Sequence, residues 1–137
     1  MLYIILGLLI LHWIADFICQ PRWMANEKSK RWDILTIHCF TYAIIIQVSI
    51  LIILILSNIS STKFESPLAI MGITLFITHF IIDFVTSKMT AYYYQIGKTK
   101  AFWNTIGFDQ ILHIWILITV FQYLYLVISI PLVPILF

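Results

Sequence analysis

Four long stretches of apolar residues alternate with short polar segments along the chain. The apolar stretches cover residues 2–19, 34–56, 67–85 and 108–130, and the joins between them cover residues 20–33, 57–66 and 86–107. Each stretch is close to, or above, the ~20 residues that a helix needs to cross the hydrocarbon of a bilayer. The pattern predicts an all-α fold, a four-span transmembrane helical bundle that forms one integral membrane domain over residues 1–137.

Composition supports lipid as the solvent of this chain. Of its 137 residues, 62% are hydrophobic and 10% are charged, against roughly 45–50% and about 25% in a soluble domain. A soluble globular protein is therefore excluded. The eight Lys and Arg are offset by six Asp and Glu, which argues against a nucleic-acid partner. Membrane lipid is the expected partner, and the two cysteines, Cys19 and Cys39, are interpreted as inert core thiols.

Basic residues are distributed unevenly among the joins. Seven of the eight Lys and Arg lie in residues 20–33 and 86–107, and Lys63 alone lies in residues 57–66. Joins rich in Lys and Arg stay on the cytoplasmic side of a membrane. With four spans, this rule places the first and third joins in the cytoplasm and both termini outside.

A short motif occurs twice. H-x-x-x-D-F begins at His12, near the end of the first stretch, and again at His79, near the end of the third. The stretch that follows each copy opens with a histidine, His38 in one case and His113 in the other. The bundle is therefore predicted to consist of two repeated helical hairpins, related by a pseudo-two-fold axis along the membrane normal.

Ionisable residues inside the apolar stretches gather at one predicted depth. An Asp at a span centre costs about 2.5–3.5 kcal/mol, so such residues point to function. Three pairs are spaced i,i+4, which places both members on one helix face. At 1.5 Å per residue, the acids lie roughly 3–5 Å and the histidines about 6–10 Å inside the cytoplasmic boundary. The set comprises His12, Asp16, His38, His79, Asp83, Asp109 and His113.

Four imidazoles and three carboxylates at one level are a ligand set for a divalent transition metal, Zn, Mn, Fe or Ni. Seven ligands exceed the needs of one catalytic zinc, so two ions about 3.5–4 Å apart and bridged by an aspartate are expected. One alternative is a set of His–Asp hydrogen bonds that fasten neighbouring helices. A bis-histidine haem is a further alternative, although histidines coupled to carboxylates suit it poorly.

Four other polar residues lie near this level. Gln20, Arg22 and Lys28 follow the first motif and could bind an anionic head group or phosphate, or they could serve only as positive-inside charge and surface anchors. Gln110 follows Asp109 and could orient a metal-bound water or bond across helices.

The motifs resemble those of a known family. H-x-x-x-D-F-x-x-Q from His12 to Gln20, H-x-x-x-D at His79 and D-Q-x-x-H from Asp109 look like a small bacterial and phage integral-membrane family of unknown function. That family is loosely similar to inner-membrane metal-dependent hydrolases, which implies a bacterial inner membrane location. Thr86 departs from the pattern, because the resemblance implies a Lys there and the nearest one is Lys88.

These observations predict a metal-dependent hydrolase of a phosphoester or similar bond in a lipid-linked or membrane-proximal substrate. The site would face the cytoplasm, with Asp16, Asp83 and Asp109 as candidates for the bridging carboxylate or the base. Alternatives are a metal-ion or proton transporter, and a non-catalytic partner of a membrane complex. An oligomer is compatible with the sequence.

Overall fold

The computed structural model describes residues 2–59 and 61–129, and these residues are almost entirely helical. No strand occurs within this part of the chain, so the prediction of an all-α protein is confirmed. The elements in chain order are α1 (Leu2–Trp13), the π-helical turn η1 (Ile14–Ile18), α2 (Arg22–Glu27), α3 (Trp32–Leu56), α4 (Ser61–Gln95) and α5 (Thr99–Ser129).

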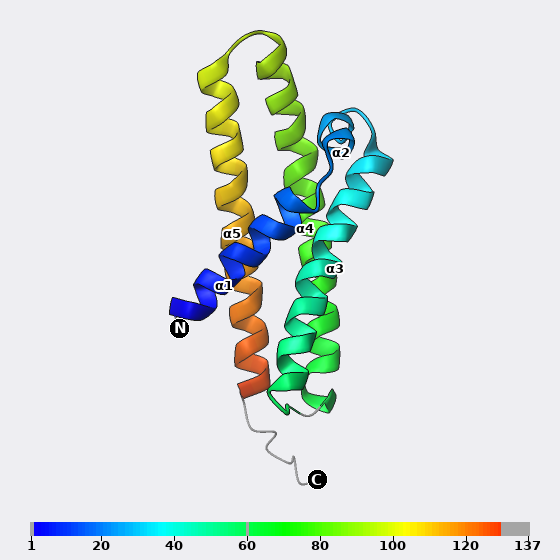
Figure 1. Ribbon diagram of the computed structural model, residues 1–137, viewed down its shortest axis with the longest axis vertical. Coiled ribbons are helices and arrows are strands. Elements are labelled where there is room, and N and C mark those ends of the chain that lie inside the picture. Colours follow the sequence, from blue (N-terminus) through cyan, green and yellow to red (C-terminus); the bar gives the residue numbers. More distant parts are fainter. Residues whose placement is uncertain (1, 60, 130–137) are drawn as a thin grey trace, which may run out of the picture.

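Three helices are long and apolar enough to cross a membrane, namely α3, the part of α4 from Phe64 to Gln95, and α5. They correspond to the last three predicted spans, but α4 and α5 extend well into the predicted join 86–107. That join is helical except for a tight turn at Gly97, whose φ is +69°. Glycine adopts this left-handed conformation without steric cost and commonly ends a helix. As a result, α4 and α5 form one long hairpin (Figure 1).

The first apolar stretch forms a shorter helix than the other three. Helices α1 and η1 together run from Leu2 to Ile18, about 25 Å at 1.5 Å per residue. In Figure 1, α1 crosses α5 and α4 obliquely. In η1 the N–H of Cys19 donates to the carbonyl of Ile14 at 2.9 Å, one residue further back than in an α-helix. Pro21 then lacks the N–H that would continue the helix, and the chain turns into α2.

Helix α4 is the centre of the bundle, because it packs along both α3 and α5, while α1 and η1 contact α3 (Figure 1). Buried residues recur every three or four positions along α3, as at Leu35, Tyr42, Ile46 and Ile50. Large apolar side chains on the other faces of the helices are exposed. A helix with apolar residues all round is typical of a membrane span, whose outer face contacts lipid.

A short arm, residues 22–30, contains α2 and lies apart from the long hairpin. Helix α2 packs on α3, and among the described residues no Cα of α2 lies within 8 Å of one in α4 or α5. Figure 1 shows the arm beside the half of the bundle that carries the α4–α5 turn. The arm and the hairpin therefore flank a space that is open between them.

Close packing of α3 on α4 depends on Gly72. The amide of Gln47 on α3 donates from Nε2 to the carbonyl oxygen of Leu68 on α4 at 3.1 Å. A Cβ atom at Gly72 would lie 2.6 Å from Oε1 of Gln47. Gly72 thus leaves room for a hydrogen bond between two helices in an apolar interior.

We expect Gly72→Ala to lower the melting temperature in detergent, because the new methyl group displaces the Gln47 amide from the Leu68 carbonyl. In a Gln47→Ala background the same change should raise the melting temperature, since Ala favours a helix over Gly by about 1 kcal/mol. Thermal unfolding of the two single variants, the double variant and the parent measures this reversal. An effect of equal sign in both backgrounds would contradict the packing described.

Candidate metal centre

The seven ionisable residues predicted from the sequence meet in one place, which we call the polar layer. They come from α1, η1, α3, α4 and α5. Six of them are at most 3% exposed, and the side chain of the seventh, Asp109, is 14% exposed. The members of the polar layer are His12, Asp16, His38, His79, Asp83, Asp109 and His113.

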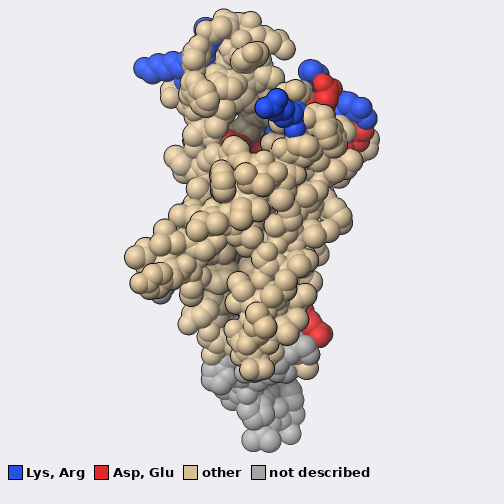
Figure 2. All heavy atoms as spheres, viewed as in Figure 1, with Lys and Arg blue, Asp and Glu red and all other residues tan. Residues whose placement is uncertain are grey.

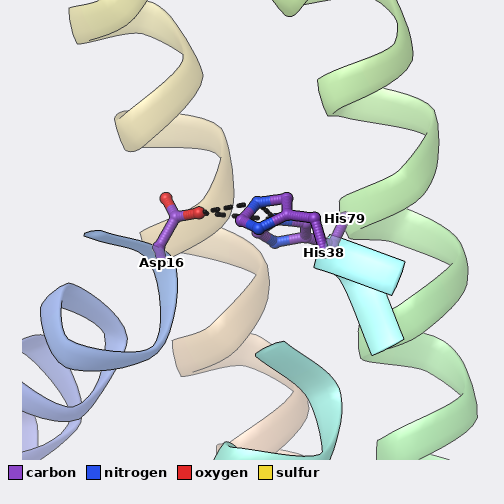
Figure 3. Close-up of side chains that lie close together, drawn as sticks. All are labelled: Asp16, His38 and His79. Carbon is purple, nitrogen blue, oxygen red and sulfur yellow. Dashed lines mark hydrogen bonds and ion pairs between the residues drawn. The ribbon is translucent and has the colours of Figure 1, made fainter. Parts of the chain in front are cut away.

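Asp16, His38 and His79 form a first ligand cluster (Figure 3). Oδ1 of Asp16 lies 3.1 Å from Nε2 of His38 and 3.5 Å from Nε2 of His79. The two imidazole nitrogens are 3.1 Å apart. An ion held tetrahedrally by N and O ligands at about 2.0–2.1 Å separates its ligand atoms by about 3.3 Å. The three atoms therefore already have the spacing of ligands around one such ion.

Asp16, Asp109 and His113 form a second ligand cluster, with ligand atoms within 4.8 Å of one another. Asp16 belongs to both clusters, and the rings of His79 and His113 lie 4.1 Å apart between centroids. Nδ1 of His113 lies 2.9 Å from the backbone carbonyl oxygen of Asp109. If Nδ1 donates there, Nε2 keeps its lone pair, an arrangement common for metal-binding histidines.

Lys28 reaches from the α2 arm into the layer. Its Nζ lies 2.6 Å from Oδ2 of Asp83 and 3.4 Å from Nε2 of His38. Burial opposes the positive charge of Lys28, but the carboxylates of Asp83 and Asp16 outweigh burial and raise the pKa of its ammonium. Gln20 adds a contact from Nε2 to Nδ1 of His38 at 3.2 Å. The arm is thus tied to α3 and α4 through polar side chains.

His12 is held by hydrogen bonds on both sides of its ring. Nδ1 lies 3.0 Å from the hydroxyl of Tyr42, and Nε2 lies 2.9 Å from Oε1 of Gln110. Nε2 of Gln110 donates at 3.0 Å to both Asp16 and Asp109. His12 therefore links α1 to α3 and α5, whereas neither ligand cluster includes it.

Tyr42 belongs to the site although the sequence analysis missed it. Its ring stacks on that of His79, with centroids 4.1 Å apart. Tyr42 follows His38 by four residues, so it lies on the same face of α3. That spacing was the available signal, but aromatic residues are too common in spans for it to stand out.

Thr86 occupies the position where the resemblance implies a Lys. Its Oγ1 donates to Oδ1 of Asp109 at 2.5 Å, so it orients a member of the second ligand cluster. Lys88 does not replace that Lys in the layer, because its Nζ lies over the ring of Phe84, 3.4 Å from the centroid. The ammonium group in the layer comes from Lys28 instead.

A cavity of about 730 Å³ opens above the layer, between the α2 arm and the α4–α5 hairpin. Three of the four predicted substrate-binding residues line it, namely Gln20, Lys28 and Gln110, together with the three aspartates of the layer. Arg22 is exposed and is not among the lining residues. Figure 2 shows Lys and Arg gathered at this end of the molecule and atoms of acidic residues inside the hollow.

The donor set fits a divalent transition metal. Among the described residues, the buried atoms without a hydrogen-bond partner include Oδ1 of Asp16, Nδ1 of His79 and Nε2 of His113. A buried polar atom without a partner costs about 1–3 kcal/mol, and coordination would satisfy Oδ1 of Asp16 in the first cluster. Imidazole and carboxylate together suit zinc, iron or manganese.

The chain belongs to the family described as a protein of unknown function (DUF3307), which it matches over residues 4–134. No curated protein and no solved structure matches it. The resemblance to a family of unknown function is thereby confirmed. The likeness to metal-dependent hydrolases stays a prediction.

Lys28→Met should lower the free energy of unfolding of metal-free protein by about 3–5 kcal/mol, because it leaves Asp83 buried without its partner. Lys30→Met is the matched control, since Lys30 pairs with Glu27 at the surface, with a side chain that is 62% exposed, and such pairs contribute little. Because the pKa of Lys28 is raised in the folded state, the stabilisation by its ion pair with Asp83 is fully present at neutral pH. It is lost only when the pH rises through the raised pKa of the folded protein, in the alkaline range. Unfolding curves in detergent, recorded at neutral and alkaline pH, measure the free energy of unfolding of both variants. An equal decrease in the two variants would refute the buried ion pair between Lys28 and Asp83.

Proposed function

We propose that this chain is a membrane-embedded metal-dependent hydrolase. It acts on a phosphoester or similar bond in a lipid-linked or membrane-proximal substrate, reached from the cytoplasmic side. The two ligand clusters would hold two divalent ions, and Asp16 would be a ligand common to both.

The charge of the polar layer is the observation that carries this proposal. With ionised carboxylates and neutral imidazoles, three aspartates face one ammonium group, that of Lys28, among the described residues. Two negative charges then remain uncompensated at a buried site, which is costly in an apolar medium. One divalent cation compensates these two charges, and it would also coordinate buried N and O atoms that have no hydrogen-bond partner. The charge therefore supports one ion, and the second ion rests on the presence of two ligand clusters that share Asp16.

Each aspartate has surroundings that suit a distinct role. Asp16 would supply the carboxylate shared by the two clusters, and its Oδ2 accepts a hydrogen bond from Gln110. Asp83 is oriented by Lys28, and Asp109 by Thr86 and Gln110. The partly exposed Asp109 is best placed to accept a proton from a water in the cavity. When bound, the ions lower the pKa of coordinated water towards about 7 and neutralise charge on a phosphoryl oxygen.

The cavity supports a substrate with a polar group. Its wall includes Oγ of Ser87, which is buried and has no hydrogen-bond partner among the described residues. Gln20 and Lys28 line the same cavity and would contact an anionic group. Because the layer lies within the span region but opens towards the charged end of the bundle, a lipid head group can reach it without crossing the bilayer.

The proposed topology has four spans, with both termini outside and the layer in the cytoplasmic half of a bacterial inner membrane. The two copies of H-x-x-x-D-F then belong to two hairpins that point the same way. The concentration of Lys and Arg at the end that carries the α2 arm and the α4–α5 turn supports this orientation (Figure 2).

A structural role for the layer is the second candidate function. Hydrogen bonds link His12 to Tyr42 and Gln110, and Lys28 to Asp83, across separate elements. Such a network could fasten the bundle without an ion. A transporter receives less support, because transport sites are typically lined by broken helices. Within the described residues, only the first helix is interrupted at the layer, at η1, whereas α3, α4 and α5, which carry five of its seven members, pass it without interruption.

Protein purified without chelator should contain about two divalent ions per chain, and His79→Ala should lower both metal content and melting temperature. The reason is that His79 belongs to the first ligand cluster and joins α4 to α3 and η1. Thr119→Ala is the control, because Thr119 is exposed on α5 and its hydroxyl donates to the backbone of Trp115. Elemental analysis and thermal unfolding in detergent give both quantities.

Chelator and pH separate a metal centre from a structural network. Metal binding needs neutral imidazoles, so metal content and melting temperature should fall together between pH 8 and 5. Ion pairs of protonated His with Asp would instead persist at pH 5 and weaken as pH rises. Purified protein whose melting temperature is unchanged by chelator and is higher at pH 5.5 than at pH 8 would establish the structural role and refute the enzyme.

Reporter fusions test the orientation. A reporter that is active only in the cytoplasm should be active when inserted within residues 20–33 or 86–107, and inactive at either terminus or within residues 57–66. The joins differ in Lys and Arg content, and the basic joins are expected in the cytoplasm. The reverse pattern would place the cavity on the outer face and exclude a cytoplasmic substrate.

A further inference from the structure

Cys39 lies in the polar layer although it is neither a carboxylate nor a histidine. It follows His38 on α3 and is 0% exposed. Its Sγ, a ring nitrogen of His79 and a carboxylate oxygen of Asp83 lie within 4.8 Å of one another. His79 and Asp83 are each 1% exposed. These three residues form a third ligand cluster, which shares His79 with the first.

A buried cysteine usually acts as a small apolar side chain, and the sequence alone favours that interpretation. The surroundings of Cys39 argue otherwise, since two of its neighbours are ligand atoms from α4. In addition, Nδ1 of His79 is buried and has no hydrogen-bond partner among the described residues. The other cysteine, Cys19, is part-exposed and belongs to none of the three clusters.

We propose that Cys39 is a sulfur ligand of an ion that it shares with His79 and Asp83 in the third ligand cluster, so that the metal bound there is a thiophilic divalent ion, zinc in particular. This inference rests on the proposed metal centre and narrows its cofactor. Thiolates favour zinc over manganese or magnesium, which prefer oxygen ligands. A set of one sulfur, one imidazole and one carboxylate is within the normal range for zinc. On binding, the S–H bond breaks, a bond from sulfur to the ion forms, and the proton passes to solvent.

A thiolate at Cys39 would also compensate for the ion pair between Lys28 and Asp83, which weakens Asp83 as a metal ligand. The Lys28 ammonium lies 2.6 Å from Oδ2 of this carboxylate, so part of its negative charge is already engaged. A thiolate beside it restores the charge that a divalent ion requires from its ligands. The ion pair between Lys28 and Asp83 is therefore compatible with metal binding by the third ligand cluster, because Cys39 supplies a further negative charge.

Cobalt(II) is the probe, because a thiolate bound to it produces a charge-transfer band in the near ultraviolet that nitrogen and oxygen ligands do not. Wild-type protein and Cys19→Ser, loaded with cobalt without oxygen, should both show this band. Cys39→Ser should lose the band yet keep visible cobalt absorption. Zinc affinity of Cys39→Ser should fall by about 100-fold, comparable with the larger losses seen when a metal's supporting residues are removed, while manganese affinity stays within about threefold.

Each outcome decides between defined alternatives. Bound cobalt without the band, or a band lost in Cys19→Ser and kept in Cys39→Ser, would refute the sulfur ligand and leave the proposed metal centre intact. Failure of wild-type protein to bind cobalt or zinc would refute both. If Cys39→Ser does not fold, X-ray absorption of zinc-loaded Cys19→Ser protein decides, since a zinc–sulfur distance of about 2.3 Å supports Cys39 and a shell of only nitrogen and oxygen excludes it.

Discussion

Three carboxylates, two buried and one half-buried, that face one ammonium group among the described residues constrain this structure more than any other interaction. Asp16, Asp83 and Asp109 come from three elements and converge on histidines that are almost completely buried. Breaking a buried ion pair costs about 3–5 kcal/mol, so each element must present its polar residue at one level or leave a charge unpaired. Apolar packing brings helices together without defining their depth. The polar layer defines it, because a shift of α4 by one turn would separate Asp83 from Lys28.

The need to bring these polar residues to one level also accounts for the irregular geometry of η1 and the turn into α2. A regular helix from Leu2 onward would continue past Asp16, whereas η1 widens the turn and Pro21 ends it. π-helical turns often occur at functional sites, and this one contains the residue shared by two ligand clusters. The chain then enters the α2 arm, which Lys28 ties to Asp83. The distortion and the arm together bring one carboxylate and one ammonium group to a layer whose other members lie on long helices.

The sequence predicted features within one segment better than contacts between residues that are far apart along the chain. The length of the apolar stretches predicted the three long helices, and the i,i+4 spacing placed His79 and Asp83 on one face of α4. These patterns gave no warning that η1 departs from α-helical geometry, nor that the predicted join 86–107 is largely helix, because Lys and Arg mark a membrane boundary rather than the end of a helix. Pairs of interacting side chains from different helices were the hardest to predict from the sequence. Nothing local pairs Lys28 with Asp83, 55 residues away, and Arg22 looked equally suitable until the fold left it exposed.

The position of the layer connects the fold to the proposed chemistry. At the centre of the bilayer the same residues would be remote from any head group, and in the joins their charges would be screened by water and would attract an ion only weakly. In the proposed topology the layer lies between these limits, so that lipid on the outer faces would keep the ligands in an apolar surrounding, while the cavity beside the α2 arm gives access from the polar end. Because α2 packs on α3 and keeps its backbone away from α4 and α5, that access is not closed by helix packing. A substrate anchored in the bilayer could then present its head group to the layer while its apolar part stays in lipid.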